Sequence, residues 1–520
     1  MTATVSRTVA RSAAEIRGVL ADLARPCWVI RDVEGVGVTT EPAPGADVLA
    51  AAPPLPPDRL GEPEFRRFHG VGSTYAAGAM ANGISSVPLV TAMARAGHLA
   101  SYGAAGVLPD KIETSLAELS RSLGTIPFAC NLIHSPSEPA LESAIVDACL
   151  RHRVRCVEAS AFMSLTPEVL RYRLTGISAG TGGSRPQTRN RLIAKVSRSE
   201  VAEHFLRPAP DTMVRALVSA GHITAEQAEL ARHVPVADDI TAEADSGGHT
   251  DRRPLTVLLP DLIATRDRVA RDFGPAAGVR IGAAGGLGTP TALAAAYAMG
   301  AAYVVTGSVN QSCVEADQSD VAKRMLASAG VADVGMAASS DMFEMGVSVQ
   351  VLRRGTMFAA RANRLYQIYR DFDGVDALPA DVRGEVEDKI LRRPCEDVWA
   401  DCVDYFRRRD PAQLDAAAQD PKRRMALIFR WYLGLSSGWA IRGESDRMAD
   451  YQVWCGPAMG AFNQWAQGCR LADVADRRVA DVATELMRGA AISTRVATLR
   501  AAGVRLPAAA VAITPLPLVE

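Results

Sequence analysis

The chain of 520 residues has no excess of charge of either sign, because 57 Lys and Arg nearly cancel 58 Asp and Glu. Such a balance excludes the basic surface by which proteins attract nucleic acid or an anionic membrane. The nine Cys include no CxxC pair and no Cys/His cluster at zinc spacing, so we expect neither disulfides nor a metal site. Reduced thiols of this kind are typical of a cytoplasmic protein.

Long apolar runs are also missing. The N-terminus has no uninterrupted apolar stretch of signal-peptide length, so secretion is not indicated. Residues 68–94 and 281–314 carry no Asp, Glu, Lys or Arg, but Gly, Pro and polar residues interrupt both stretches. We therefore expect buried α/β segments there and no membrane span. With 48% hydrophobic residues, the chain has enough apolar side chains for a large core.

Composition divides the chain into three predicted domains. Residues 1–65 form an N-terminal appendage, in which a small β hairpin at Cys27–Thr40 precedes a linker with seven Pro between Glu41 and Pro63. Residues 66–375 alternate short β-rich runs with amphipathic helices, the pattern of parallel βαβ units. Residues 376–520 are predicted to form a helical C-terminal domain.

The middle domain predicts an α/β fold with eight parallel strands. A closed (β/α)₈ TIM barrel is the favoured arrangement, although a doubly wound open sheet also fits. Residues 207–239 add helices after the fifth strand, as a lid over the substrate or as a neutral decoration. The predicted strands are Tyr75–Met80, Leu99–Tyr102, Phe128–Leu132, Arg155–Ala159, Leu192–Ser197, Ile240–Ala244, Val279–Ala284 and Ala302–Thr306.

Two glycine-rich turns follow the last two predicted strands. Gly285 and Gly286 come after the seventh strand, and Gly307 and Ser308 come after the eighth. In a TIM barrel, backbone N–H groups of these two loops form a phosphate site, and glycine allows the phosphate to approach closely. A tight turn is the alternative explanation for each pair, but their joint position favours a bound phosphate.

A histidine follows the sixth predicted strand, in the segment Ser246-Gly247-Gly248-His249. At the catalytic end of a barrel, His249 is suited to proton transfer or to a hydrogen bond with a reacting carbonyl. The chain has only five Lys, and Lys195 alone lies inside a predicted barrel strand. Because an unpaired buried ammonium is costly, this position also indicates a function.

Several motifs together resemble a known family. The segments AMANG (79–83), FACN (128–131), SGGH (246–249), AGG (284–286) and Gly307-Ser308 are similar to the FMN-dependent barrels that include FabK-type enoyl-acyl-carrier-protein reductases and nitronate monooxygenases. The longer strings ADSGGHTDRRPLTVLLP, RLIAKVSRSEVAEHFLRPAP and KRRMALIFRWYLGL resemble the PfaD family, the trans-acting enoyl reductases of polyunsaturated fatty acid and polyketide synthases. This resemblance covers nearly the whole chain.

The resemblance implies a flavin site and a catalytic residue. It assigns His249 as the catalytic residue, with Lys195 facing the flavin and stabilising its reduced form. FabK-type enzymes lack both the helical insertion and the helical C-terminal domain, so their substrate channel is not transferred to this chain. The positions implied to bind FMN are Met80, Ala81, Asn131, Lys195, Gly247, Gly248, Gly285, Gly286, Gly307 and Ser308.

The expected activity is an FMN-dependent enoyl reductase. It takes hydride from NADPH or NADH through FMN to the β-carbon of a 2-enoyl thioester, with an acyl carrier protein as partner. A nitronate monooxygenase-like flavin oxygenase and a non-catalytic carrier-docking subunit are the alternatives. The role of His249 as proton donor or carbonyl-binding group stays open, as do the choice of nicotinamide and a homodimeric state.

Overall fold

A computed structural model describes residues 9–134, 139–183 and 185–515. Residues 1–8 of the predicted appendage and 516–520 of the predicted C-terminal domain lie outside this description. The chain divides into two compact units that interleave in sequence. The barrel unit consists of Met1–Ala244, Arg253–Ala316 and Gln464–Glu520, and the helical unit of Asp245–Arg252 and Asp317–Asn463. The domain boundaries at residues 65 and 375 stay predictions.

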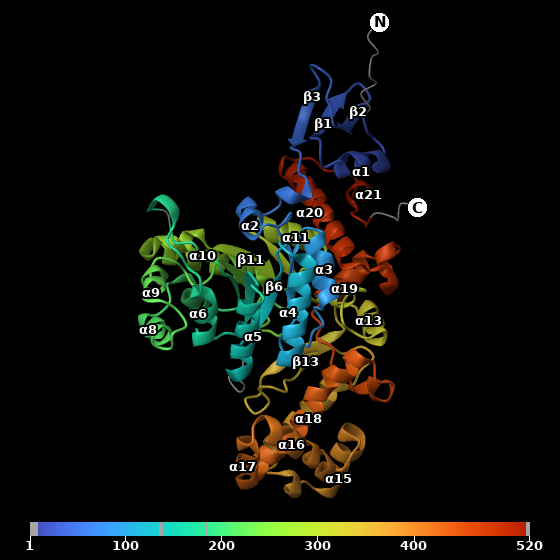
Figure 1. Ribbon diagram of the computed structural model, residues 1–520. Helices are drawn as coiled ribbons and strands as arrows, with labels where there is room; N and C mark the ends of the chain where they lie inside the picture. The colour runs from blue at the N-terminus through green and yellow to red at the C-terminus, as the bar shows by residue number, and fades with distance from the viewer. Residues whose placement is uncertain (1–8, 135–138, 184, 516–520) are drawn as a thin grey trace. The chain divides into compact units, whose positions relative to one another are not determined.

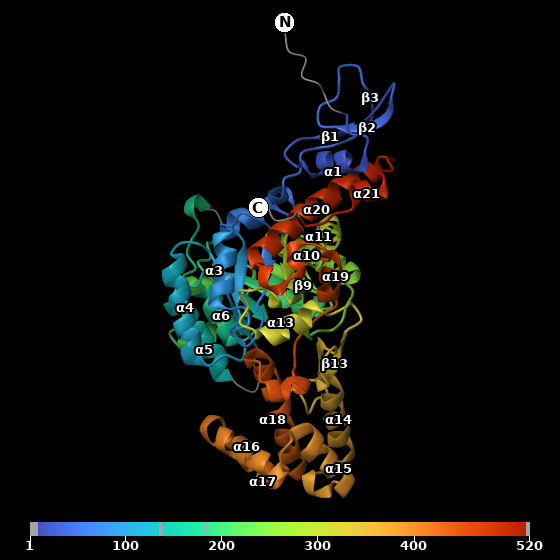
Figure 2. The ribbon, with the colours of Figure 1, turned by 90° about the vertical axis from the view of Figure 1, so that its right-hand side faces the viewer.

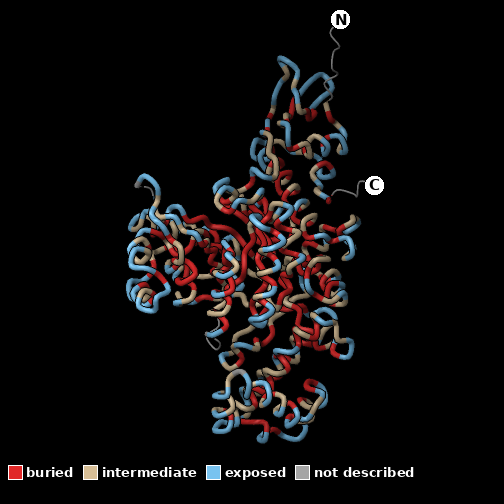
Figure 3. The backbone as a smooth tube through the Cα atoms, in the orientation of Figure 1, coloured by how far each residue is buried: buried red, intermediate tan, exposed pale blue. Residues whose placement is uncertain are grey.

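Within the described residues, eight parallel strands close into a barrel, which confirms the predicted fold class and excludes the open sheet. Each predicted strand is present, with ends that differ by up to three residues. In Figure 3, which has the orientation of Figure 1, buried residues gather in the region where Figure 1 draws the barrel. In barrel order they are β4 (Tyr75–Ala77), β5 (Leu99–Tyr102), β6 (Ala129–Ile133), β7 (Cys156–Ser160), β8 (Arg191–Val196), β9 (Asp239–Glu243), β11 (Arg280–Ala284) and β12 (Val304–Thr306).

Helices cover the outside of the barrel (Figure 1). Side chains of Ser86, Thr166 and Thr289 cap three of them by accepting a backbone N–H of the first turn. The insertion after the fifth strand is confirmed as α8 (Asp211–Ser219) and α9 (Ala225–Ala231). The other helices are α3 (Val87–Arg95), α4 (Pro109–Leu123), α5 (Pro139–Arg151), α6 (Pro167–Leu174), α7 (Ser199–Leu206), α10 (Leu255–Asp272), α11 (Pro290–Ala298) and α12 (Ser308–Gln311).

The amino end of the barrel is closed by α2 (Pro63–His69). The Phe65 ring is fully buried and stacks on Tyr303 with ring centroids 4.3 Å apart. His69 Nε2 lies 2.8 Å from Asp239 Oδ2, and Arg280 pairs with the same carboxylate at 2.6 Å. These groups fill the base of the barrel, and active sites of barrels with this fold lie at the carboxyl ends of the strands.

The N-terminal appendage is a small antiparallel sheet packed with a C-terminal helix. Its described strands lie in the order β2 (Gly35–Thr39), β1 (Cys27–Asp32) and β3 (Asp47–Ala52), beside α1 (Ala13–Ala21). The β1–β2 hairpin was predicted, whereas β3 lies inside the predicted linker. Helix α20 (Val479–Ala501) runs beside α11 (Figures 1 and 2) and buries Arg495, whose guanidinium donates to the carbonyls of Asp22 and Arg25.

The helical unit also contains a sheet that the sequence did not predict. In the described residues, β13 (Val334–Ala338) and β14 (Ser348–Leu352) form an antiparallel hairpin, and β10 (Gly248–His249) pairs with β14. The described part of the chain has no helix that is long and apolar enough to cross a membrane. The unit's helices are α13 (Asp320–Ala327), α14 (Phe358–Asp371), α15 (Ala380–Gly384), α16 (Cys395–Arg409), α17 (Ala412–Gln419), α18 (Pro421–Arg442) and most of α19 (Ala458–Trp465), while α21 (Ala508–Val511) belongs to the barrel unit.

Candidate active site

A partly buried ion cluster lies where three neighbouring strands of the barrel end. Lys195 Nζ on β8 is 2.8 Å from Glu243 Oε1 on β9 and 3.4 Å from Glu158 Oε1 on β7. Burial acts to lower the pKa of Lys195, but the two carboxylates outweigh this effect and raise the pKa above its usual value. Lys195 therefore stays charged, and one ammonium with two carboxylates gives the cluster a formal charge of −1.

Glu158 also holds the loop that follows the first barrel strand. Its Oε1 accepts the backbone N–H of Ala79 at 3.3 Å, one residue before Met80. Ser85 Oγ accepts the Met80 N–H at 2.9 Å, and the Ser85 N–H donates to the Met80 carbonyl at 3.2 Å. Met80 and Ala81, the predicted flavin-facing residues, are thus fixed from both sides.

Asn131 on β6 is buried beside β7, the strand that carries Glu158. Its Nδ2 donates to the Glu158 carbonyl at 3.1 Å and to Ser160 Oγ at 3.0 Å, so the amide orientation is set by two partners on β7. The exposed fraction of Asn131 is 4%. Asn131 therefore has a fixed side chain, and it lies inside β6, two residues before the strand end where it was predicted.

The two predicted phosphate loops are glycine turns with open space beside them. Gly285 and Gly286 follow β11 with φ of +88° and +71°, a region that favours glycine. A Cβ placed on Gly286 or Gly307 would meet no heavy atom within 4 Å, so both turns face open space. Ser308 begins the short helix α12 directly after β12. These residues fit a phosphate group held by backbone N–H groups.

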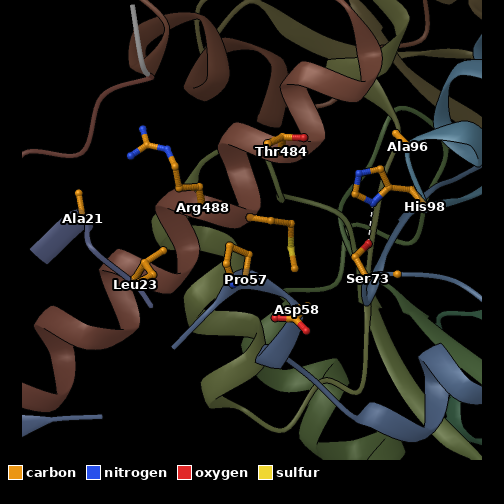
Figure 4. A pocket seen from close by; sticks show the side chains of 11 residues that line it. Ala21, Leu23, Pro57, Asp58, Ser73, Ala96, His98, Thr484 and Arg488 are labelled. Atoms are coloured by element: carbon orange, nitrogen blue, oxygen red, sulfur yellow. Dashed lines mark hydrogen bonds between the residues drawn. The ribbon is translucent and has the colours of Figure 1, made fainter. Parts of the chain in front are cut away.

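Figure 4 shows a separate hollow of about 510 Å³, which lies at the amino end of the strands. It is lined by Ser73 and His98, which precede β4 and β5, and by Met487 and Arg488 of α20. His98 Nδ1 is 2.6 Å from Ser73 Oγ, and burial lowers the pKa of His98 to about 4. Because catalytic groups of such barrels gather at the carboxyl end, we do not assign the active site here.

The structure places Gly247, Gly248 and His249 in the helical unit. Gly247 is packed so closely on the backbone of Cys455 that a Cβ would come within 2.8 Å, and Gly248 has a φ of +83°. His249 pairs with Val349 of β14, and its Nε2 is 3.0 Å from Asp341 Oδ2. The glycines therefore fix the backbone course of this histidine-bearing segment.

The barrel unit thus brings together the predicted residues Met80, Ala81, Asn131, Lys195, Gly285, Gly286, Gly307 and Ser308 at the carboxyl ends of its strands. Sequence reasoning missed Glu158, Glu243, Ser85 and Asp341. Like Lys195, Glu158 and Glu243 are charges inside predicted apolar strands, and this signal could have found both. Ser85 and Asp341 carry no comparable signal in the sequence.

Family profiles match three parts of the chain. The profile described as nitronate monooxygenase matches residues 74–362, and that of the fatty acid synthase subunit PfaD N-terminal domain matches residues 5–54. The inserted helical domain of [acyl-carrier-protein] S-malonyltransferase matches residues 372–451. The profiles therefore cover most of the predicted appendage and barrel and the first half of the predicted helical domain.

The chain is similar to parts of large synthases. It is 46% identical to one subunit of the polyunsaturated fatty acid synthase of Thraustochytrium sp., over 85% of this chain and 30% of that protein. It is 41% identical to the polyketide biosynthesis protein PksE of Bacillus subtilis, over 84% of this chain and 56% of that protein. The chain spans between 22% and 56% of the length of the four relatives that are at least 41% identical to it.

Solved structures agree with this relationship. The enoyl reductase domain of MlnA, from the macrolactin biosynthesis cluster of Bacillus amyloliquefaciens, aligns with a TM-score of 0.81 and 35% identity, over 86% of this chain and 99% of that domain. FabK from Thermotoga maritima aligns with a TM-score of 0.50 and 18% identity, which supports the barrel fold alone. The chain belongs to the nitronate monooxygenase family of barrels and, within it, to the PfaD family.

Proposed function

We propose that this protein is an FMN-dependent enoyl reductase that uses NADPH or NADH and acts on 2-enoyl thioesters of an acyl carrier protein. The observation that carries the proposal is the similarity to the enoyl reductase domain of MlnA, which extends over 99% of that domain at 35% identity. The ion cluster of Lys195, Glu158 and Glu243 and the open glycine turns at the carboxyl end of the barrel also support the proposal.

The barrel residues fit FMN better than a dinucleotide. The turns at Gly286 and Gly307 offer space for one phosphate, while Met80, Ala81 and Asn131 would bind the flavin ring. No GxGxxG sequence opens the first βα unit for a pyrophosphate. Gly247 and Gly248 are proposed as further cofactor contacts from the resemblance. When bound, FMN would supply hydride transfer between the nicotinamide and the enoyl β-carbon.

The protein's own residues orient and polarise the reactants. His249 would donate a proton to the α-carbon or hydrogen-bond the thioester carbonyl, and both roles favour reduction because they neutralise or stabilise the negative charge that hydride addition leaves on the substrate. Lys195, held by Glu158 and Glu243, keeps a fixed positive group at the carboxyl end of the barrel. The loop held by Ser85 and Glu158 keeps Met80 in one place.

Mass analysis of the cofactor released from the purified protein tests the first part of the proposal. We expect FMN, and recovery of FAD would contradict the assignment of the glycine turns to a single phosphate. A colourless protein that does not take up added FMN would instead favour the non-catalytic docking subunit.

Anaerobic turnover of a 2-enoyl thioester with NADPH tests the second part. We expect His249→Ala to retain flavin and its reduction by NADPH but to lose roughly 10²- to 10⁴-fold in enoyl reduction, the range of a missing general acid or base. Turnover at the parent rate would make His249 structural.

A nitronate monooxygenase-like oxygenase is the second candidate, because that profile matches residues 74–362. The two functions are separated by the substrate that the enzyme consumes. Oxygen uptake with a nitronate, together with no enoyl reduction, would favour the oxygenase.

We further propose that the carrier protein docks beside the barrel mouth in trans. Carrier proteins are acidic, and the half-buried Arg207 and the exposed Arg215 at the helical insertion suit such a partner. The value of kcat/KM should be higher for a carrier-bound thioester than for the same acyl group on a short pantetheine mimic, and this preference should weaken with salt. Equal efficiency at low and moderate salt would mean that the protein recognises only the thioester and its arm.

A further inference from the structure

The histidine of the SGGH segment has a carboxylate partner far away in sequence. His249 Nε2 lies 3.0 Å from Asp341 Oδ2, across 92 residues of chain. Asp341 belongs to the loop that joins β13 to β14, and His249 pairs with Val349 at the start of β14. The carboxylate and the ring are therefore presented by neighbouring parts of one small sheet.

The Asp341 carboxylate is itself held in place. Ser339 Oγ donates to its Oδ1, and the N–H of Met342 donates to the same oxygen at 3.1 Å. One carboxylate oxygen is thus occupied by the loop, and the other faces His249. Partial burial acts to raise the pKa of Asp341, but the hydrogen bonds from His249 and Ser339 outweigh it and lower that pKa to about 2.

The loop is anchored on helices of the same unit through Phe343. This side chain is fully buried, and its ring lies 5.6 Å from Tyr366, 5.2 Å from Tyr369 and 6.3 Å from Phe429. The two tyrosines lie on α14 and Phe429 on α18. Asn363 of α14 also accepts the Ala338 N–H at 3.0 Å, so the helices fix the strand that enters the loop.

A close backbone contact strengthens this anchor. Gly346 has a φ of +72°, and a Cβ on it would come within 2.3 Å of the Tyr366 hydroxyl oxygen. The loop can therefore approach α14 only because this position is glycine. Asp341 consequently has a defined place relative to the helices that carry Tyr366 and Phe429.

We infer that Asp341 is the positioning residue of His249, and that the helices α14 and α18 act in the reaction by holding the loop that carries it. Asp341 keeps a proton on Nε2, fixes the plane of the ring and favours the charged imidazolium, the form that donates a proton. The inference depends on the proposed function only for the reaction in which His249 takes part.

Other ionisable groups on the small sheet and its connecting loop are few. Strands β13 and β14 contribute none, and the loop adds Glu344, which pairs with Arg430 of α18 at 3.2 Å. The segment of His249 itself carries Asp245, which accepts a hydrogen bond from Gln350 at 2.6 Å, together with Asp251 and Arg252. Glu344 thus provides a matched control, since it lies in the same loop but pairs with another partner.

The experiment follows the side-chain NMR signals of histidine in the full chain, with His249 assigned from the signal that His249→Gln removes. In Asp341→Asn, which keeps the size of the side chain, we expect the pH midpoint of the His249 titration to fall by about one unit, because the carboxylate no longer stabilises the imidazolium. Asp341→Glu should restore part of the shift, and Glu344→Gln should leave the midpoint unchanged. An unchanged midpoint in Asp341→Asn would overturn the inference.

A second variant tests the anchor without touching the carboxylate. Gly346→Ala should displace the loop and lower the same midpoint while the barrel unit stays folded, and a parent-like midpoint in a folded protein would contradict the role of the helices. In turnover, Asp341→Asn should reduce kcat roughly 10- to 100-fold with little change in KM. If the parent chain reduces no enoyl thioester yet its His249 titration depends on Asp341, the proposed function fails and the positioning role stands.

Discussion

At the scale of single residues, the charge around Lys195 decides how this site would act on a flavin. A lone ammonium would favour the anionic reduced ring, but here two carboxylates lie within 3.4 Å of Nζ. The cluster therefore carries formal charge −1, and its field at a distance opposes further negative charge. Lys195 weakens this unfavourable negative field, and its ammonium group is also a hydrogen-bond donor with a fixed position.

This balance predicts opposite effects for two substitutions. Glu158→Gln removes one negative charge, so we expect the midpoint potential of the bound flavin to rise by tens of millivolts, whereas Lys195→Gln should lower it by a similar amount. Potentiometric titration of each purified variant measures both shifts. Glu113→Gln, which alters an ion pair between α4 and α5 on the outside of the barrel, should leave the potential unchanged. Shifts of the same sign in both variants would contradict this account.

The sequence predicts where some of these residues lie in the fold, but it does not predict the contacts of others. Gly285, Gly286, Gly307 and Ser308 follow apolar strand-like runs, so their place at the carboxyl end of the barrel could be inferred from chain order. The pairing of His249 with Asp341 could not, because it joins groups 92 residues apart through a hairpin with no strong turn signal. Neither strand of that hairpin was predicted.

At the scale of elements, the loop after β4 depends on one close backbone contact. A Cβ on Gly103, which follows β5, would come within 1.8 Å of the Met80 carbonyl oxygen. The Gly83 N–H donates to the Gly103 carbonyl at 2.9 Å, and the Gly103 N–H donates to the Ser85 carbonyl at 3.0 Å. Two barrel loops are therefore locked together beside the predicted flavin position of Met80.

Substitution of this glycine should loosen flavin binding. In Gly103→Ala the loop must move away from the added methyl group, so we expect the dissociation constant for FMN to rise at least about tenfold while the barrel stays folded. Quenching of flavin fluorescence measures the affinity, and circular dichroism monitors the fold. Gly18→Ala is the control, since a Cβ there meets no atom within 4 Å. Parent affinity in Gly103→Ala would show that this loop does not bind the flavin.

At the scale of the molecule, periodicity predicted the barrel but not the grouping of the chain into units. Eight apolar runs separated by helices leave few ways to bury every strand, and closure is one of them. The compact units instead interleave, since residues 245–252 join 317–463, and α20 joins the barrel unit. Such groupings depend on contacts between distant segments, as when Arg495 binds carbonyls of the appendage.

A buried histidine at the amino end of the barrel makes the stability of the protein depend on pH. His98 is 7% exposed beside Ser73 and Tyr75, and burial lowers its pKa from 6.5 to about 4. Above pH 6.5 the ring is neutral in both folded and unfolded chains, so it adds no pH dependence. Between pH 6.5 and 4 only the unfolded chain binds the proton, and the free energy of unfolding falls as pH falls.

The size of the effect is set by the gap between the two pKa values. At pH 5 the loss from His98 alone should be about 2 kcal/mol, an upper estimate that relaxation of the site would reduce. We expect His98→Gln to show a smaller drop in free energy of unfolding between pH 7 and pH 5 than the parent chain, measured by urea unfolding of the full protein at both pH values. His222→Gln, which changes an exposed ring, should keep the parent's pH dependence. If His98→Gln loses as much stability as the parent over this range, another group controls the acid limit of the barrel.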